Sequence, residues 1–141
     1  MRSSRLPILL AFLLLTGCGG SGLKLYPVKG KVSYNGKPLT TGSVMFTPKA
    51  KGPAAYGAIG ADGTYKLMTG EEEGAVAGPH TVMISAMKDN GVNSPMSYLI
   101  PAKYGSESSG LEADVKDQGE NTFDFAITGK EISEKPVPVM P

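Results

Sequence analysis

The chain has 141 residues, a formal net charge of +1, a single cysteine and no tryptophan. Its length is sufficient for one domain with a hydrophobic core of its own. The only arginines are Arg2 and Arg5. The remainder of the chain therefore lacks the guanidinium groups that dominate phosphate recognition, and we expect no nucleic-acid partner.

The first 17 residues have the composition of an export signal. Arg2 and Arg5 precede an apolar run over residues 6–15 that only Pro7 interrupts. A basic start followed by a short apolar stretch is typical of a secretory signal. About ten apolar residues are too few to cross a bilayer, which needs roughly twenty. We therefore predict that residues 1–17 are a signal peptide and are removed.

The apolar run ends in Leu15, Thr16, Gly17 and Cys18, which include the only cysteine of the chain. This order resembles the lipobox of bacterial lipoproteins. The resemblance implies that the Cys18 thiol receives a diacylglycerol, that cleavage follows Gly17, and that the new amino end is acylated. Two or more acyl chains anchor a protein stably, whereas a single chain does so only marginally. The alternative is a plain secretory signal with an incidental cysteine.

Residues 18–26 are predicted to be the lipidated cysteine and a flexible tether, which spans at most ~30 Å when fully extended. Gly19, rather than an aspartate, follows the cysteine, and this resembles lipoproteins that are sorted to the outer membrane. We therefore expect the protein in the bacterial cell envelope, lipid-anchored and facing the periplasm. With Cys18 used as the anchor, no cysteine remains for a disulfide within the chain.

The rest of the chain shows short strand patterns separated by turn residues and no convincing helical period. Alternation of apolar and polar residues predicts strands at residues 28–34, 44–47, 56–61, 64–69, 80–87, 111–116 and 123–127. Asn35-Gly36 and Asp62-Gly63 are typical turn pairs. Seven such strands favour an all-β fold, a seven-stranded antiparallel β-sandwich over residues 27–129. The proline-rich residues 130–141 are predicted to be a flexible tail.

The same alternation predicts which side chains face the core. The inward set is aliphatic and aromatic and includes Val28, Val32, Val44, Phe46, Tyr65, Leu67, Val82, Ile84, Phe123, Phe125 and Ile127. Lys29, Lys31, Lys66 and Asp124 fall on the opposite parity and are predicted to point outward.

An ordered series of motifs resembles a known family. The series comprises Val32 and residues 35–39 (NGKPL), 42–44 (GSV), 62–65 (DGTY) and 78–82 (GPHTV). It is similar to the carboxypeptidase regulatory-like domain, a transthyretin-like sandwich of seven strands. Later motifs at residues 100–104, 109–111 and 121–125 resemble small bacterial lipoproteins built on that domain. The resemblance implies the sandwich fold and brings no catalytic residues, because this domain is not the catalytic part of carboxypeptidases.

The sequence contains no pattern that specifies catalysis or metal binding. His80 is the only histidine, and a structural role is expected because a histidine-based triad needs placed partners. One histidine without a free cysteine does not make a usual zinc site. Glu71, Glu72 and Glu73 suggest calcium, but consecutive residues diverge, so a solvated acidic loop is favoured. We expect neither an enzyme nor a cofactor.

Residues 88–110 are not explained by strand and turn patterns. Loops of this length are uncommon unless they are functional or disordered. Tyr98, Ile100, Lys103 and Tyr104 are candidates for a partner-binding surface, since aromatic side chains beside a charge are common in contact hot spots. The alternative is that this segment folds back and caps the sandwich.

Two functional hypotheses follow from the sequence. The first is a lipid-anchored, non-catalytic β-sandwich module for binding, adhesion or envelope structure. Its partners would be the membrane, through the lipid on Cys18, and an envelope protein or polysaccharide. The second is a periplasmic protein that holds a small ligand, such as a carbohydrate or calcium, or that assists another protein.

Overall fold

The computed structural model describes residues 22–130, and these residues form an all-β fold, as the sequence predicted. The predicted signal peptide, the lipobox with Cys18 and the predicted tail beyond Lys130 lie outside the described residues. Between residues 22 and 130, no helix has the length and apolar character that a membrane crossing requires.

The described residues contain fifteen strands, many of them only two residues long, and one short 3-10 helix. In chain order these are β1 (Leu25–Tyr26), β2 (Val28–Tyr34), β3 (Lys37–Pro38), β4 (Ser43–Pro48), β5 (Ala55–Ala58), β6 (Thr64–Lys66), β7 (Met68–Thr69), β8 (Glu72–Glu73), β9 (Ala75–Val76), β10 (Gly78–Ser85), β11 (Met87–Lys88), β12 (Ser97–Tyr98), η1 (Ala102–Gly105), β13 (Leu111–Val115), β14 (Asn121–Thr122) and β15 (Phe125–Ile127).

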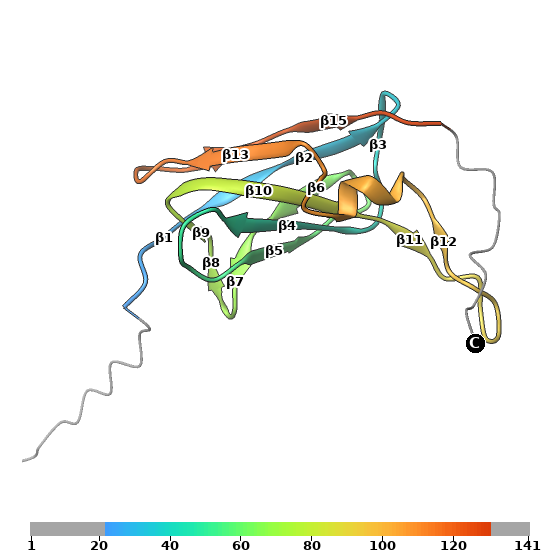
Figure 1. The fold of residues 1–141 in the computed structure, drawn as a ribbon, viewed down its shortest axis with the longest axis horizontal. Coiled ribbons are helices and arrows are strands. Elements are labelled where there is room, and N and C mark those ends of the chain that lie inside the picture. Colours follow the sequence, from blue (N-terminus) through green and yellow to red (C-terminus); the bar gives the residue numbers. More distant parts are fainter. Residues whose placement is uncertain (1–21, 131–141) are drawn as a thin grey trace, which may run out of the picture.

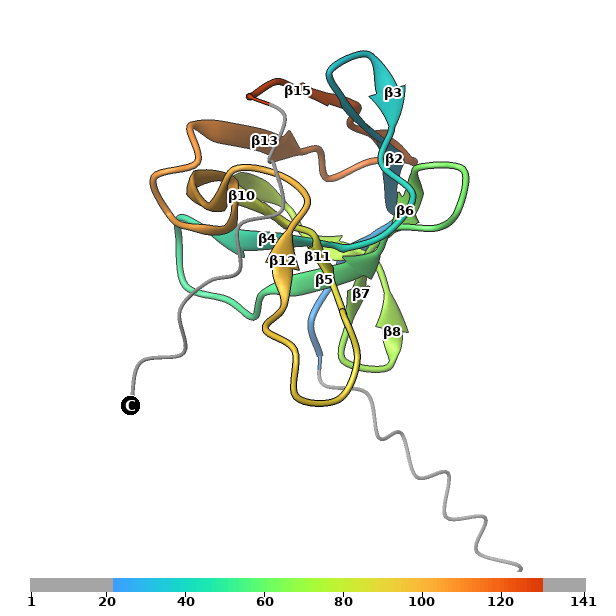
Figure 2. The same ribbon diagram turned by 90° about the vertical axis from the view of Figure 1, so that its right-hand side faces the viewer.

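Two larger sheets enclose a common core (Figures 1 and 2). The first has the strand order β13-β10-β4-β5-β7-β8, with antiparallel neighbours throughout. The second is built around β2, which pairs with β14 and β15 and also with β3 and β6. The segment 64–69 connects the two sheets, because β6 pairs with β2 while β7 pairs with β5.

The pairing of β2 with the last strands differs from the predicted antiparallel arrangement. Both β14 and β15 run parallel to β2, with Asn121 opposite Val28 and Ile127 opposite Tyr34. Parallel neighbours need a long crossover rather than a tight turn, and the chain between residues 35 and 120 supplies it. Alternation shows which side chains face inward but not which strands are neighbours, so the sequence pattern does not reveal this pairing.

The core follows the predicted alternation, and Phe46 lies at its centre. Phe46 is fully buried, and its ring centroid lies 6.4, 5.8 and 6.1 Å from those of Tyr65, Phe123 and Phe125. Phe123 and Phe125 are only half-buried, although the alternation places both inward. They belong to the region of β14 and β15, which within residues 22–130 pairs with β2 alone, and each ring remains partly exposed.

Gly30, in the middle of β2, is a point of very close approach between two chain segments. A Cβ atom at Gly30 would lie 1.7 Å from the carbonyl oxygen of Phe123. The Tyr65 hydroxyl donates a hydrogen bond of 2.7 Å to the same oxygen. Burial raises the pKa of the Tyr65 hydroxyl above its ordinary value, which keeps the donor protonated. Only a glycine in β2 leaves room for this arrangement.

Asp124 has a structural role that strand parity did not predict. It lies between β14 and β15, where the ladder with β2 is interrupted. Its Oδ1 atom accepts a hydrogen bond of 2.9 Å from the backbone amide of Lys31. Asp124 is exposed, as predicted, yet its carboxylate satisfies a backbone donor that the interrupted ladder leaves without a strand partner.

The domain begins earlier than the sequence predicted. Leu25 and Tyr26, assigned to the tether, form β1 and pair with Val76 and Ala75 of β9. At the other end, the carbonyl of Lys130 accepts a hydrogen bond of 2.7 Å from the Tyr34 hydroxyl.

We expect Gly30→Ala to lower the free energy of unfolding by about 3 kcal/mol or more, at the upper end of overpacking costs. The new methyl group would meet backbone atoms of Phe123, which cannot move aside as a flexible side chain can. Urea unfolding followed by circular dichroism measures the loss. Gly105→Ala is the matched control, since its nearest neighbour would be 3.7 Å away and we expect a change within about 0.5 kcal/mol. Equal losses in the two variants would contradict the interpretation.

Candidate functional site

A groove of about 520 Å³ lies over the second sheet and is the candidate site. Three lysines line it, Lys29, Lys31 and Lys66, and Asp124 is the one acidic residue among the described residues of the lining. The other lining residues are mostly small or carry hydroxyl groups, and they are Gly30, Ala58, Gly60, Thr64, Tyr65 and Thr122. The volume is within the range of ligand pockets in proteins.

Strand register brings the three lysines together. Lys29 and Lys31 face the same side of β2, because side chains alternate along a strand, and both are exposed. Lys66 of β6 lies directly opposite Lys29. Like charges in directly opposed positions destabilise a sheet, so the arrangement concentrates positive charge at a cost to folding.

Acidic residues that do not line the groove form ion pairs with two of these lysines. The Nζ atom of Lys29 lies 2.5 Å from Glu120 Oε1, and that of Lys66 lies 3.4 Å from Glu73 Oε1. Neither glutamate lines the groove. Exposed ion pairs of this kind contribute only about 0–1 kcal/mol, so both ammonium groups can exchange these partners for a bound anion.

A second hollow of about 350 Å³ continues the groove along β2. The two hollows share Lys31 and Asp124, and the second adds Asp62. One oxygen of Asp62 accepts hydrogen bonds from the hydroxyl and the amide of Thr64, at 2.6 and 3.1 Å. These bonds hold the pKa of Asp62 below its ordinary value. The first hollow is therefore lined by three lysines and Asp124, and the second by Lys31 with Asp62 and Asp124.

The structure divides the predicted partner surface into buried and exposed residues. Ile100 and Tyr104 are 1% and 7% exposed and belong to the core. The Tyr104 hydroxyl donates a hydrogen bond of 2.6 Å to the carbonyl of Thr128. Lys103 is exposed, and its Nζ atom lies 4.9 Å from the centroid of the Tyr104 ring. Ile100 and Tyr104 thus cap the core, as the alternative interpretation of this segment predicted.

Other exposed residues of this region lie on the β11–β12 hairpin, which extends from one end of the domain (Figure 1). Tyr98 is 37% exposed and pairs with Met87 across the hairpin. Val92, between the two strands, is 93% exposed. Tyr98 and Lys103 are the residues of the predicted surface that a partner can reach.

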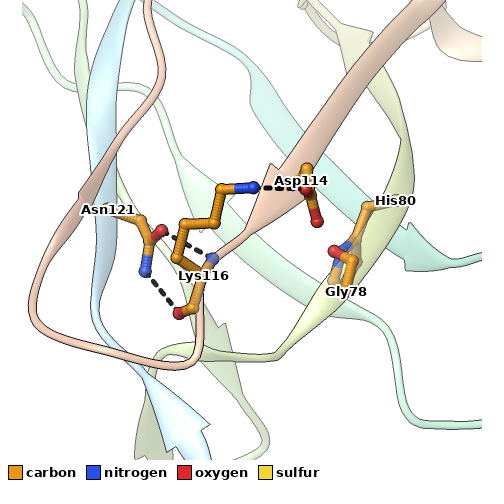
Figure 3. Close-up of polar contacts among 5 residues, drawn as sticks. All are labelled: Gly78, His80, Asp114, Lys116 and Asn121. Carbon is orange, nitrogen blue, oxygen red and sulfur yellow. Dashed lines mark hydrogen bonds and ion pairs between the residues drawn. The ribbon is translucent and has the colours of Figure 1, made fainter.

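His80 is a buried residue of β10 (Figure 3). Its Nδ1 atom lies 2.8 Å from the carbonyl oxygen of Gly78. Because a carbonyl only accepts, Nδ1 carries the proton and Nε2 is bare. Within the described residues Nε2 is buried and has no hydrogen-bond partner.

The neighbours of His80 in Figure 3 form a structural cluster rather than a reactive one. Asp114 binds Lys116 at 2.6 Å. The Asn121 side chain accepts a hydrogen bond from the Lys116 amide and donates one to its carbonyl, at 2.8 and 3.2 Å. Asn121 thereby closes the turn between β13 and β14. Burial lowers the pKa of His80, and the bond to Gly78 and the charge of Asp114 oppose this effect only in part.

Residues 22–130 contain no group of three or more histidine, cysteine, aspartate or glutamate side chains placed to hold a metal ion. Glu71, Glu72 and Glu73 are all exposed. Sequence reasoning placed Lys29, Lys31 and Lys66 on outward parity but did not recognise them as a site. The site is recognised by the closeness of the three lysines, and this closeness arises because β2 and β6 are neighbouring strands.

Comparisons of the chain with protein-family models, with curated proteins and with solved structures find no match. The interpretation of the groove therefore depends on its residues alone.

The two tyrosines of the predicted surface are expected to differ sharply in their effect on stability. Tyr104→Ala should lower the free energy of unfolding by about 3 kcal/mol or more, because it removes a buried ring. Tyr98→Ala should change it by less than about 1 kcal/mol, since much of its ring is in solvent. Thermal and urea unfolding check both values. A small loss for Tyr104→Ala would show that the segment is no cap.

His80 should make stability depend on pH. The unfolded chain binds a proton at this residue near its ordinary pKa of 6.5, whereas the folded protein does so only at lower pH. The free energy of unfolding should therefore fall as the pH is lowered from 7 to 5, by up to about 1.4 kcal/mol per pH unit. His80→Leu should reduce this slope in urea titrations at each pH. An unchanged slope would contradict the assignment.

Proposed function

We propose that the protein is a lipid-anchored module of the bacterial cell envelope, and that its β domain binds a partner or ligand and performs no catalysis. The observation that carries the proposal is the order Leu15, Thr16, Gly17 and Cys18 after a basic start and a short apolar run. The proposed location is the outer membrane, with the domain facing the periplasm.

The position of the first strand supports an anchor at Cys18. Cys18 precedes Leu25, the first residue of β1, by seven residues. Such a link spans at most ~25 Å when extended, so the lipid would keep the domain close to the membrane. β1 and the β11–β12 hairpin lie at opposite ends of the long axis (Figure 1). The exposed residues of the hairpin, Tyr98 among them, would then be directed away from the anchor.

For the domain itself we propose the transthyretin-like sandwich of the carboxypeptidase regulatory-like family. Two sheets around one core support this assignment, as do strands at each of the seven predicted positions. The turn pairs Asn35-Gly36 and Asp62-Gly63 of the motifs lie between strands.

A second candidate function is a periplasmic small-ligand carrier or accessory protein. The lysine-lined groove favours it, because the groove combines charged groups with a volume suited to a ligand. Its ammonium groups suit an acid-bearing or hydroxylated molecule such as a carbohydrate, and not a cation such as calcium.

Replacement of the cysteine tests the anchor. Cys18→Ala should leave a chain that carries no lipid and retains residues 1–17, because the thiol is the acceptor of the diacylglycerol. Mass spectrometry of the membrane fraction measures both properties. Ser21→Ala, three residues further on, should be processed and lipidated normally. A mature chain that starts at another residue and lacks lipid would refute the proposed anchor.

A further inference from the structure

We propose that the groove over β2, β6 and β14 binds an acidic polysaccharide, a chain that carries both carboxylate and hydroxyl groups. This inference deepens the binding role proposed above and depends on it for the expectation that the domain has a ligand. The charge of the groove, its shape and the order of its polar groups support this ligand class.

The charge of the groove favours an anionic ligand. The lining of the larger hollow contains three ammonium groups and one carboxylate, that of Asp124. Lys29 and Lys66 oppose each other on neighbouring strands, and this juxtaposition disfavours folding unless negative charge lies nearby. Glu120 and Glu73 supply such charge from outside the groove through exposed ion pairs. A ligand carboxylate in the groove would contact both ammonium groups at once.

The shape of the groove favours an extended ligand. The two hollows follow β2 from Lys29 to Ser33, a path of roughly 13 Å at the rise of an extended strand. Small residues, among them Gly30, Ala58 and Gly60, lie between the lysines that line the larger hollow. An open groove that is continued along a strand by a second hollow suits a linear chain better than a compact molecule.

The polar groups of the second hollow favour a saccharide over an acidic peptide. The second hollow is lined by the carboxylates of Asp62 and Asp124 together with Lys31, and the two carboxylates accept hydrogen bonds and repel other anions. Saccharide hydroxyls donate to such acceptors, whereas the side chains of an acidic peptide carry only further acceptors.

The test is a titration of the detergent-solubilised full chain with trigalacturonic acid, followed by calorimetry at low ionic strength. Maltotriose has the same number of rings without the acid groups, and triglutamate has the acid groups without the rings. We expect binding of trigalacturonic acid that weakens as sodium chloride is added. We expect binding at least tenfold weaker for maltotriose and for triglutamate.

Two variants with equal changes in charge locate the site. The triple variant Lys29→Gln, Lys31→Gln and Lys66→Gln should weaken binding of trigalacturonic acid at least tenfold. The control variant replaces three exposed lysines outside the groove, Lys49→Gln, Lys51→Gln and Lys116→Gln, and should weaken it less than twofold. All the substituted side chains are exposed, and thermal unfolding verifies that both variants fold.

Three results would overturn the inference. These are no binding of trigalacturonic acid by the unsubstituted chain, equal loss in the two triple variants, or binding of triglutamate as tight as that of trigalacturonic acid. The first excludes the ligand class, the second shows a nonspecific charge effect, and the third identifies an acidic peptide. Lipid attachment at Cys18 is measured separately by mass, so failure of the groove is distinguishable from failure of the proposed anchor.

Discussion

The contact between Gly30 and the Phe123 carbonyl is the constraint on which the second sheet depends. The absence of a side chain at Gly30 allows the last part of the chain to lie against β2 more closely than any other residue would permit. The Tyr65 hydroxyl binds the same carbonyl oxygen and so ties β6 to this point. Three segments that are distant in the sequence therefore meet at one backbone atom. The ladder between β14 and β15 is interrupted next to this point, and there Asp124 accepts a hydrogen bond from the Lys31 amide.

Side-chain hydrogen bonds, in addition to strand pairing, hold residues 128–130 at the end of the domain. The Tyr104 hydroxyl binds the carbonyl of Thr128, and the Tyr34 hydroxyl binds that of Lys130. Asn35 both donates to the Gly129 carbonyl and accepts from its amide, at 3.0 Å each. The hydrogen bond from Tyr104 to Thr128 explains why this aromatic residue of an irregular segment is buried. Its ring fills the end of the core while its hydroxyl satisfies a backbone acceptor.

The polar groups of the second sheet show how a solvated surface can become a binding site. Lys29 and Lys66 are stabilised by Glu120 and Glu73, and all four side chains are about half exposed to solvent, where such pairs contribute little. A ligand that offers a better-placed carboxylate thus competes with weak interactions rather than strong ones. Asp62 and Asp124, in contrast, are each engaged by hydrogen bonds from the backbone. They form the fixed part of the two hollows, and the lysines form their adaptable part.

The sequence by itself determined the all-β class, the position of each main strand and the side of each strand that faces the core, because alternation is a local property of an extended chain. It also contains the lipobox-like order that ends in Cys18, which needs no fold to be recognised. Only the tertiary structure decided that β14 and β15 run parallel to β2, that Ile100 and Tyr104 cap the core, and that His80 is buried. It alone brought Lys66 opposite Lys29. The physical reason is that strand neighbours are selected by packing between residues distant in the chain, and a local pattern contains no information about which distant segments meet.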